Sequence, residues 1–257
     1  MDAEKLRGLF DLSDRTAIIT GGTRGIGLAL ARGYLAAGAN VVVASRSQEN
    51  CAAIEASLDA EAPGRVAAVP THAGDLDQLR NLVTQTVSRF GGIDIVVNNA
   101  ATALAQPLGE MTPQAWDKSM SVNARGPLFL VQEALPYLAE SRHAAVLNVV
   151  SVAAFIFSPN VAIYAAGKSA LMTLTRSMAA AYADRGIRVN ALAPGSVYTD
   201  MVSNNPPEFL DVLANSSFLH RMADPDEMVG PALLLTSDAG SFITGQVLIA
   251  DGGLVYR

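Results

Sequence analysis

Three residues of the sequence have the types and spacing to exchange a proton near neutral pH. Tyr164 and Lys168 are four residues apart, so on a helix they lie on the same face. A phenol has a pKa of about 10, and an adjacent ammonium lowers it by favouring the phenolate, so lysine suits a tyrosine that exchanges protons near neutral pH. Ser151 stands thirteen positions before Tyr164, at the end of a predicted strand. An ordinary surface contact between tyrosine and lysine is the alternative.

A glycine-rich segment suits the binding of a nucleotide. Residues 20–27 read TGGTRGIG and lie directly after a predicted strand and before a predicted helix. Glycine lets the backbone turn sharply and approach a pyrophosphate, while the exposed N–H groups and the helix N-terminus attract its negative charge. A glycine turn without a ligand is the alternative. The segment predicts a dinucleotide-binding turn, whose candidate contacts are Gly21, Thr23, Arg24, Gly25, Ile26 and Gly27.

Both groups need a scaffold, and the hydrophobic pattern predicts one. Short β-branched runs alternate with long Ala/Leu-rich stretches at helical spacing, which is typical of βαβ units around a parallel sheet. We predict strands at 16–20, 40–44, 66–70, 93–97, 145–150, 187–193 and 246–250. We predict helices at 25–37, 48–60, 75–90, 113–140, 163–184 and 225–236. The expected fold class is therefore α/β, a Rossmann-type doubly wound and mainly seven-stranded parallel sheet with helices on both faces.

Composition narrows the possible functions. Of the 257 residues, 50% are apolar and 16% are charged, which excludes disorder by composition. The net charge of -6 gives no field that would collect nucleic-acid phosphates. One cysteine and three histidines supply neither an internal disulfide nor a zinc-finger spacing. Residues 1–13 lack the apolar run of a secretory signal, and polar residues interrupt the uncharged stretch 144–167. We predict a cytoplasmic protein without a membrane span or structural metal.

The organisation of the chain predicts one catalytic domain over residues 1–257, because there is no internal repeat, low-complexity tract or linker. Within it, residues 199–223 lack regular periodicity and mix proline, asparagine and serine with large apolar residues. An insertion of this length in a compact α/β chain is more often functional than idle. We predict that it is a substrate lid, and the alternative is a segment that serves packing or a subunit interface.

Taken together, the motifs resemble those of the short-chain dehydrogenase/reductase family, in its single-domain branch. The resemblance covers essentially the whole chain. Ala101 stands where the family usually has glycine, which is tolerated unless that position needs a positive φ. The matching motifs are TGxxxGxG at 20–27, Asn98-Asn99-Ala100, Asn123, Ser151, Tyr164-x-x-x-Lys168, Pro194-Gly195 with Thr199, Thr244-Gly245-Gln246 and Asp251-Gly252-Gly253.

The resemblance implies the catalytic roles. Tyr164 would donate a proton to a carbonyl oxygen in reduction or accept one from a hydroxyl in oxidation, and Ser151 would hold that oxygen. Lys168 would lower the Tyr164 pKa and bind the nicotinamide ribose. Asn123 would hold a water that links Lys168 to solvent. Because the hydride belongs to the cofactor, the protein would supply position, protons and exclusion of water.

The resemblance also implies cofactor contacts beyond the glycine turn. His72 stands where the family has an aspartate that touches the adenine amino group. An imidazole nitrogen can accept from that amine, and the alternative is an ordinary loop residue. Asn98 is expected to tie the central strands together rather than to bind the ligand. The implied contacts are His72, Ala73, Asn99, Ala100, Tyr164, Lys168, Pro194, Gly195, Val197 and Thr199.

The end of the second strand bears on the choice between NAD and NADP. An acidic residue there would accept both ribose hydroxyls and repel a 2'-phosphate. Ser45 is neutral and is followed by Arg46, and Arg24 in the glycine turn offers a second cation. We therefore predict NADP(H) as cofactor, with two merely solvated arginines as the alternative.

The leading hypothesis is an NADP(H)-dependent oxidoreductase that transfers a hydride between nicotinamide and a carbonyl compound or secondary alcohol. The alternatives are a 3-oxoacyl thioester reductase of fatty-acid synthesis and, outside enzymes, a dinucleotide-sensing regulator. We predict a homotetramer that pairs through the helices at 113–140 and 163–184, as members of the family commonly do. An apolar wall beside Ser151 and Tyr164 would favour bulky carbonyl substrates, and its candidate residues are Phe155, Ile156, Phe209, Leu210, Leu213 and Phe218.

Overall fold

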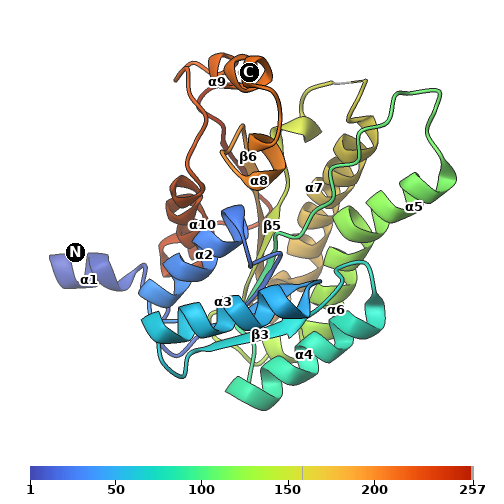
Figure 1. Cartoon of the computed structure of the whole chain (residues 1–257). Helices are drawn as coiled ribbons and strands as arrows, with labels where there is room; N and C mark the ends of the chain where they lie inside the picture. Colours follow the sequence, from blue (N-terminus) through green and yellow to red (C-terminus); the bar gives the residue numbers. More distant parts are fainter. Residues whose placement is uncertain (158, 256–257) are drawn as a thin grey trace.

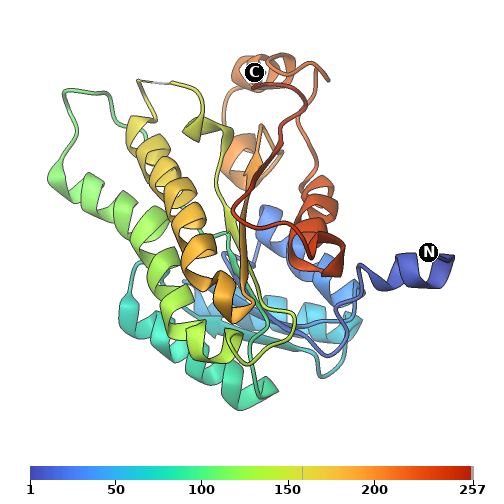
Figure 2. The same ribbon diagram turned by 180° about the vertical axis from the view of Figure 1, so that it is seen from behind.

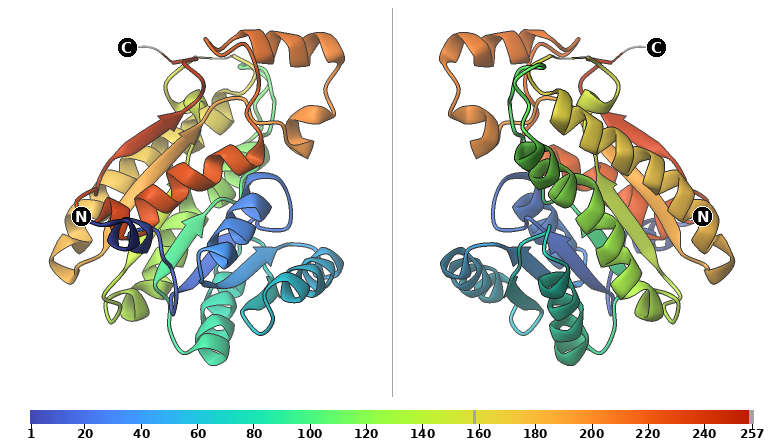
Figure 3. Two further views of the ribbon diagram at one scale, coloured as in Figure 1. Left: turned by 90° about the vertical axis from the view of Figure 1, so that its left-hand side faces the viewer. Right: turned by 90° about the vertical axis from the view of Figure 1, so that its right-hand side faces the viewer.

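A parallel sheet forms the centre of the computed structural model, which describes residues 1–157 and 159–255 (Figures 1 and 3). In this part of the chain seven strands pair in the order β3-β2-β1-β4-β5-β6-β7, all parallel. The Rossmann-type fold predicted from the alternating pattern is therefore confirmed. The strands are β1 (Thr16–Thr20), β2 (Asn40–Ser45), β3 (Val66–Pro70), β4 (Ile95–Asn98), β5 (Ala145–Val149), β6 (Arg188–Pro194) and β7 (Val247–Ala250).

Helices cover both faces of the sheet, because its central strands are apolar on both sides. In β1, for example, Ala17, Ile18 and Ile19 have no exposed surface, although successive side chains point to opposite faces. One core lies between the sheet and α2 (Gly25–Ala36), α3 (Gln48–Glu61) and α10 (Val229–Thr236). The other lies under α4 (Leu76–Phe90), α6 (Gly126–Leu138) and α7 (Ala162–Tyr182), and Figure 2 shows α6 and α7 on one side of the strands. No helix in the described ranges combines the length and apolarity needed to cross a bilayer.

The strand order reverses between β1 and β4, which places a ligand-binding crevice at their carboxyl ends. These strands are neighbours in the sheet, with Ile19 paired to Val97, but their crossover helices lie on opposite faces. In open α/β sheets such a switch point is where ligands bind. Thr20 ends β1 and Asn98 ends β4, so the glycine turn and the Asn98-Asn99 segment meet there.

The predicted helix at 113–140 is interrupted. It consists of α5 (Pro113–Met120), a π-helical turn at Ser121–Arg125 and α6. Pro127 has no N–H with which to bond the Asn123 carbonyl four residues earlier, so a regular α-helical ladder cannot pass this point. A side chain at Gly126 would place its Cβ 1.8 Å from the Ala73 carbonyl oxygen, and only glycine allows that approach.

Two further differences from the sequence prediction concern short helices. Residues 199–223, expected to be irregular, contain α8 (Asp200–Ser203) and α9 (Pro207–Asn215). Pro207 begins α9 because proline is well tolerated in the first helical turn. The N-terminal segment forms α1 (Ala3–Gly8), capped by Asp2, whose side chain accepts from the Lys5 N–H at 2.8 Å.

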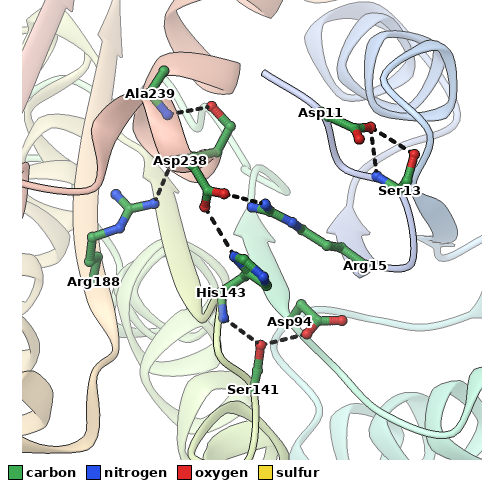
Figure 4. Close-up of polar contacts among 10 residues, drawn as sticks. Asp11, Ser13, Arg15, Asp94, Ser141, His143, Arg188, Asp238 and Ala239 are labelled. Carbon is green, nitrogen blue, oxygen red and sulfur yellow. Dashed lines mark hydrogen bonds and ion pairs between the residues drawn. The ribbon is translucent and has the colours of Figure 1, made fainter. Parts of the chain in front are cut away.

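A polar cluster joins the segments at the amino-terminal edge of the sheet (Figure 4). The buried Arg15 side chain contacts Asp238 at 2.8 Å, and His143 Nδ1 lies 3.1 Å from the same carboxylate. Burial raises the pKa of Asp238, but hydrogen bonds from Arg15 and His143 lower it below its usual value. Nearby, Asp94 accepts hydrogen bonds from the Thr16 N–H and the Ser141 hydroxyl. The cluster fixes the end of the fold that lies away from the crevice.

Candidate active site

The predicted catalytic and cofactor residues gather on loops and helix starts at the carboxyl ends of the strands. Figure 1 shows the segments after β4, β5 and β6 at this same upper end, with α8 beside the strand ends and α9 at the top of the view. Parallel strands deliver their following loops to one edge, so residues far apart in sequence meet there. The site is thus a consequence of the sheet topology.

The glycine turn is held tightly against β4. Gly21 and Gly25 have positive φ values of 67° and 53°, a conformation that favours glycine. A Cβ on Gly27 would lie 2.2 Å from the Gly21 carbonyl oxygen, so helix α2 can begin this close to the turn only with glycine. The Asn99 amide donates to the carbonyls of Thr20 and Gly21 at 2.9 and 3.2 Å. Asn99, predicted as a cofactor contact, therefore also shapes the turn. Ile26, also predicted as a contact, packs its side chain against the core and has only its backbone at the helix start.

Thr20 begins the predicted glycine motif but was not among the predicted site residues. Its hydroxyl donates to the Val97 carbonyl at 3.3 Å and accepts from the backbone N–H groups of Asn99 and Ala100 at 3.1 and 3.0 Å. One side chain thus joins the ends of β1 and β4. Ala101 does not have a positive φ. The backbone at this position therefore does not require the glycine that the family usually has there.

The end of β2 lies beside the glycine turn, as predicted. The Thr23 hydroxyl donates to the Ser45 hydroxyl at 3.1 Å. This contact holds Ser45, the neutral residue at the position predicted to select between NAD and NADP. Arg46 and Arg24 are both exposed. Arg24 lies 3.6 Å from Asp200, the first residue of α8, so one of the two predicted phosphate cations contacts the start of the predicted lid. Asp200 was not a predicted site residue.

His72 differs from the expected arrangement. Its Nδ1 accepts the Gly74 N–H at 3.1 Å. In a neutral imidazole the other nitrogen, Nε2, then carries the proton and donates. The predicted acceptance of an adenine amino hydrogen therefore does not fit this tautomer. Ala73 is the next residue, and its carbonyl oxygen lies against Gly126, the first residue of α6.

The structure brings Ser151, Tyr164 and Lys168 together. Ser151 lies shortly after β5, where its hydroxyl caps a short 3-10 turn by accepting from the Ala153 N–H at 3.1 Å. Burial raises the pKa of Tyr164, and a hydrogen bond with Ser151 opposes that effect. The Lys168 ammonium lies 5.7 Å from the centre of the Tyr164 ring.

Lys168 is held by the backbone of β5. Its side chain is 1% exposed, and Nζ donates to the Val149 carbonyl at 2.7 Å. Burial lowers the pKa of Lys168 to about 8. The lowering of the Tyr164 pKa that the sequence analysis assigned to Lys168 is not found, because burial dominates at the phenol. Sequence spacing placed the two groups on one face but could not show how strongly both are desolvated.

Asn123 is fully buried in the π-helical turn. Its amide nitrogen donates to the Thr102 carbonyl at 2.9 Å and to the Ser119 hydroxyl at 3.1 Å, and its amide oxygen accepts from the Thr102 N–H at 3.1 Å. Ser119 in turn donates to the carbonyl of Ile163, the residue before Tyr164, at 3.4 Å. Asn123 therefore braces the loop after β4 and the start of α7. Ser119 was not a predicted site residue. Its position four residues before Asn123, on the same helix face, was the sequence signal that could have identified it as a partner of Asn123.

The remaining predicted cofactor contacts follow β6. Pro194 ends the strand, and a Cβ on Gly195 would lie 2.7 Å from the Asp251 Cα, so the chain needs glycine there. Val197 is 4% exposed, which leaves its backbone rather than its side chain for a ligand. The Thr199 methyl group lies 3.1 Å from the position of a Cβ on Gly25, so the lid begins against the glycine turn.

The predicted apolar wall is only partly formed. Phe155 packs against the core cluster around Val150 and Leu171 and so contributes to packing. Ile156, after it, is 44% exposed. On the lid, Phe209 is 47% exposed, Leu210 and Leu213 are half-buried, and the Phe218 ring lies 2.6 Å from the position of a Cβ on Gly253.

Comparison with known proteins decides the family. Residues 21–255 match the family model described as Enoyl-(Acyl carrier protein) reductase. The 3-oxoacyl-[acyl-carrier-protein] reductase FabG of Thermotoga maritima is 34% identical over 244 residues, which cover 95% of this chain and 99% of the relative. The chain belongs to the short-chain dehydrogenase/reductase family. The resemblance read from the motifs is confirmed.

Other similar proteins agree with this assignment. Gluconate 5-dehydrogenase of Gluconobacter oxydans is 35% identical over 248 residues, 96% of each chain. The crystal structure of a dehydrogenase/reductase from Sinorhizobium meliloti 1021 has a TM-score of 0.93 and 30% identity, covering 98% of this chain and 100% of the other. The structure of a blue fluorescent protein from a metagenomic library in complex with NADPH has a TM-score of 0.90 and 31% identity, covering 96% and 100%. This member of the short-chain dehydrogenase/reductase family is an oxidoreductase of alcohol or carbonyl groups that uses a nicotinamide dinucleotide.

Proposed function

We propose that this chain is an NADP(H)-dependent oxidoreductase acting on hydrophobic carbonyl compounds and the corresponding secondary alcohols. The observation that carries the proposal is the meeting of Ser151, Tyr164 and Lys168 at the same end of the parallel sheet as the glycine turn. Catalysis of this kind needs a proton donor, a group that holds the substrate oxygen and a site for the dinucleotide within one crevice.

The residues present fit a dinucleotide. A Cβ on Gly21, Gly22 or Gly27 would come within 3.0 Å of neighbouring atoms, so glycine keeps the backbone bare where the N-terminus of α2 would meet a pyrophosphate. Thr23 and Ser45 together offer hydroxyls where an adenine ribose would lie, and Asn99 and Ala100 line the switch point. A bound nicotinamide would supply the hydride in reduction and accept it in oxidation.

The protein's own residues then manage the proton. The Ser151 hydroxyl would hold the substrate oxygen, and the Tyr164 hydroxyl would donate its proton to that oxygen in reduction. Lys168 would bind the nicotinamide ribose, and its positive charge would favour the phenolate once both groups are close to the ribose. Asn123 would keep a water that connects Lys168 to solvent. Replacing Tyr164 by Phe should leave NADPH affinity nearly unchanged and remove most turnover, whereas turnover that survives this change would contradict the assignment.

The preference for NADPH over NADH rests on charge. Arg46 can bind a 2'-phosphate bidentately while Arg24 approaches from the glycine turn, and the neutral Ser45 does not repel it. The NADPH complex of the similar blue fluorescent protein supports this cofactor. Charge-assisted hydrogen bonds predict a preference of roughly tenfold to a few hundredfold in Kd.

Two titrations test the cofactor choice. NADPH and NADH are titrated against the wild type and against a variant that combines Ser45→Asp with Arg46→Gln. We expect the preference to invert, because the carboxylate accepts the ribose hydroxyls and repels the phosphate. Equal affinities in the wild type would show that both arginines are only solvated and that the cofactor is NAD(H).

The substrate class follows from the half-formed apolar wall. Phe209 and Phe218 on the predicted lid and Ile156 on the loop after Ser151 present large exposed apolar side chains, and pockets with few polar groups hold apolar ligands. Bulky ketones should therefore have a higher kcat/KM than sugars or polyols such as gluconate. The similarity to a 3-oxoacyl-[acyl-carrier-protein] reductase makes acetoacetyl thioesters the necessary comparison substrate, and faster turnover of these thioesters would favour the fatty-acid alternative.

The assembly and location belong to the same proposal. We expect one catalytic domain, with a lid at about 199–223, in a cytoplasmic homotetramer. Pairing would use α5, α6 and α7. The stretch from Ala170 to Ala183, which covers most of α7, carries Arg176 as its single charged residue. Light scattering at micromolar concentration measures the state directly, and a monomer would refute it.

A further inference from the structure

A chain of buried polar side chains connects the catalytic helix α7 with the two central strands. The Asn98 amide nitrogen donates to the Asn148 amide oxygen at 2.8 Å, and the Asn148 amide nitrogen donates to the Thr175 hydroxyl at 2.9 Å. Thr175 donates its own proton to the Leu171 carbonyl at 2.8 Å. Asn148 and Thr175 have no exposed surface, and Asn98 is 2% exposed. Every link is therefore formed away from solvent.

Thr175 gives α7 a second attachment to the strand that holds Lys168. Lys168 and Thr175 are seven residues apart, two turns of one helix face. Lys168 donates to the Val149 carbonyl of β5, and Thr175 accepts from the side chain of Asn148, the preceding residue of that strand. The two contacts together define both the distance and the rotation of α7 relative to β5.

The other end of the chain reaches the cofactor crevice. Asn98 and Asn148 are paired in register on β4 and β5, and the Asn98 amide also lies 3.4 Å from the Pro127 carbonyl, just after the π-helical turn. The next residue, Asn99, holds the Thr20 and Gly21 carbonyls of the glycine turn. The same set of buried hydrogen bonds thus spans the helix that carries Tyr164 and the strand that supports the dinucleotide turn.

We propose that Thr175 is a positioning residue, which acts through Asn148 to set the place of Lys168 relative to the cofactor crevice. An apolar residue of the same shape would satisfy packing at this point, but it would leave the Asn148 amide without its acceptor in a dry interior. The strand and helix would then separate or rotate to admit water. Since catalysis depends on sub-ångström placement of reacting groups, the loss appears in turnover.

The test uses Thr175→Val, Thr175→Ser and the matched control Thr86→Val. Thr86 is likewise fully buried, and its hydroxyl donates to the Leu82 carbonyl at 2.8 Å, but it lies on α4 outside the chain of contacts. The sequence contains three lysines, Lys5, Lys118 and Lys168, so NMR of lysine-labelled protein resolves Lys168 without cofactor. Steady-state turnover of a ketone with NADPH gives the second readout.

We expect Thr175→Val to lower kcat about tenfold, and to raise the pH at which Lys168 titrates from about 8 toward its ordinary value of 10.5, because water reaches the ammonium. Thr175→Ser keeps the hydroxyl and should show the kcat and the Lys168 titration of the wild type. Thr86→Val should change neither kcat nor that titration. An unchanged kcat and titration in Thr175→Val, or equal effects in Thr86→Val, would overturn the proposal. If Thr175→Val does not fold, Thr175→Cys tests the same contact in milder form. The turnover arm rests on the proposed function; an inactive wild type would count against that function, while the titration of Lys168 still decides the role of Thr175.

Discussion

Replacing Lys168 by Met should stabilise the protein near neutral pH while abolishing turnover. The Lys168 ammonium is fully buried, and burial lowers its pKa from 10.5 to about 8. This difference corresponds to roughly 3 kcal/mol of destabilisation whenever the group is protonated in both the folded and the unfolded states. Methionine has a similar length and no charge, but it loses the hydrogen bond to Val149, which costs about 1 kcal/mol. The expected net gain at pH 7 is therefore about 2 kcal/mol.

The sign of the pH dependence follows from the lowered pKa. Below pH 8 the lysine is protonated in both states, so its burial cost is fully present. As the pH rises through the folded pKa toward the unfolded pKa, the folded protein loses the proton first, and the cost falls to below about 1 kcal/mol at pH 10. The advantage of Lys168→Met should accordingly disappear at pH 10.

Urea unfolding of the wild type and Lys168→Met at pH 7 and pH 10 measures both effects. Lys118→Met is the matched control, because Lys118 is exposed and its replacement should leave stability within about 0.5 kcal/mol. A variant that is less stable than the wild type at pH 7, or an advantage that does not change with pH, would refute the reasoning. It would mean that Lys168 is hydrated in solution and not held against β5.

Two other expectations concern charges at opposite ends of the molecule. Asp200→Asn removes the carboxylate that contacts Arg24 and should lower the Kd for NADPH about two- to fivefold, because exposed ion pairs contribute up to about 1 kcal/mol. The Kd for NADH should not change in this variant. The Kd for NADPH should not change in the control lid variant Asp211→Asn. Weaker NADPH binding by Asp200→Asn in fluorescence titration would contradict this. Asp238→Asn leaves the buried Arg15 cation without its carboxylate partner and should destabilise the protein by about 1 to 3 kcal/mol at pH 7. The pKa of Asp238 in the folded protein is held below 3.8. The difference in unfolding free energy between the wild type and Asp238→Asn should therefore persist from pH 7 to pH 5 and vanish as the pH falls through the folded pKa. Acid unfolding of both proteins measures this.

The parts of the site that sequence could predict are those coded by local spacing. The Tyr164 and Lys168 pair needs only helical periodicity, and the glycine turn needs only its place between a strand and a helix. Contacts between distant segments gave no such signal. Asn148 and Thr175 meet because β5 and α7 pack together, so neither residue is recognisable from its neighbours in sequence. The desolvation that sets the pKa values of Tyr164 and Lys168 is likewise a property of the assembled core.

The boundaries that were predicted wrongly have local causes. Pro206 and Pro207 were read as signs of an irregular segment, but a proline in the first turn is compatible with a helix, and α9 starts there. The break in the helix at 113–140 was signalled by Gly126 and Pro127, yet the apolar periodicity on either side continues through it. Periodicity reports which residues face the core and does not register a change in hydrogen-bond pattern.

The π-helical turn at Ser121–Arg125 makes chain length at this place a functional constraint. Each residue of an α-helix advances the direction of its side chain by about 100°, so removing a residue between Ser119 and Asn123 would turn the Asn123 side chain away from the Ser119 hydroxyl that it now contacts. Evolution and engineering can therefore exchange side chains in this stretch more freely than they can insert or delete residues.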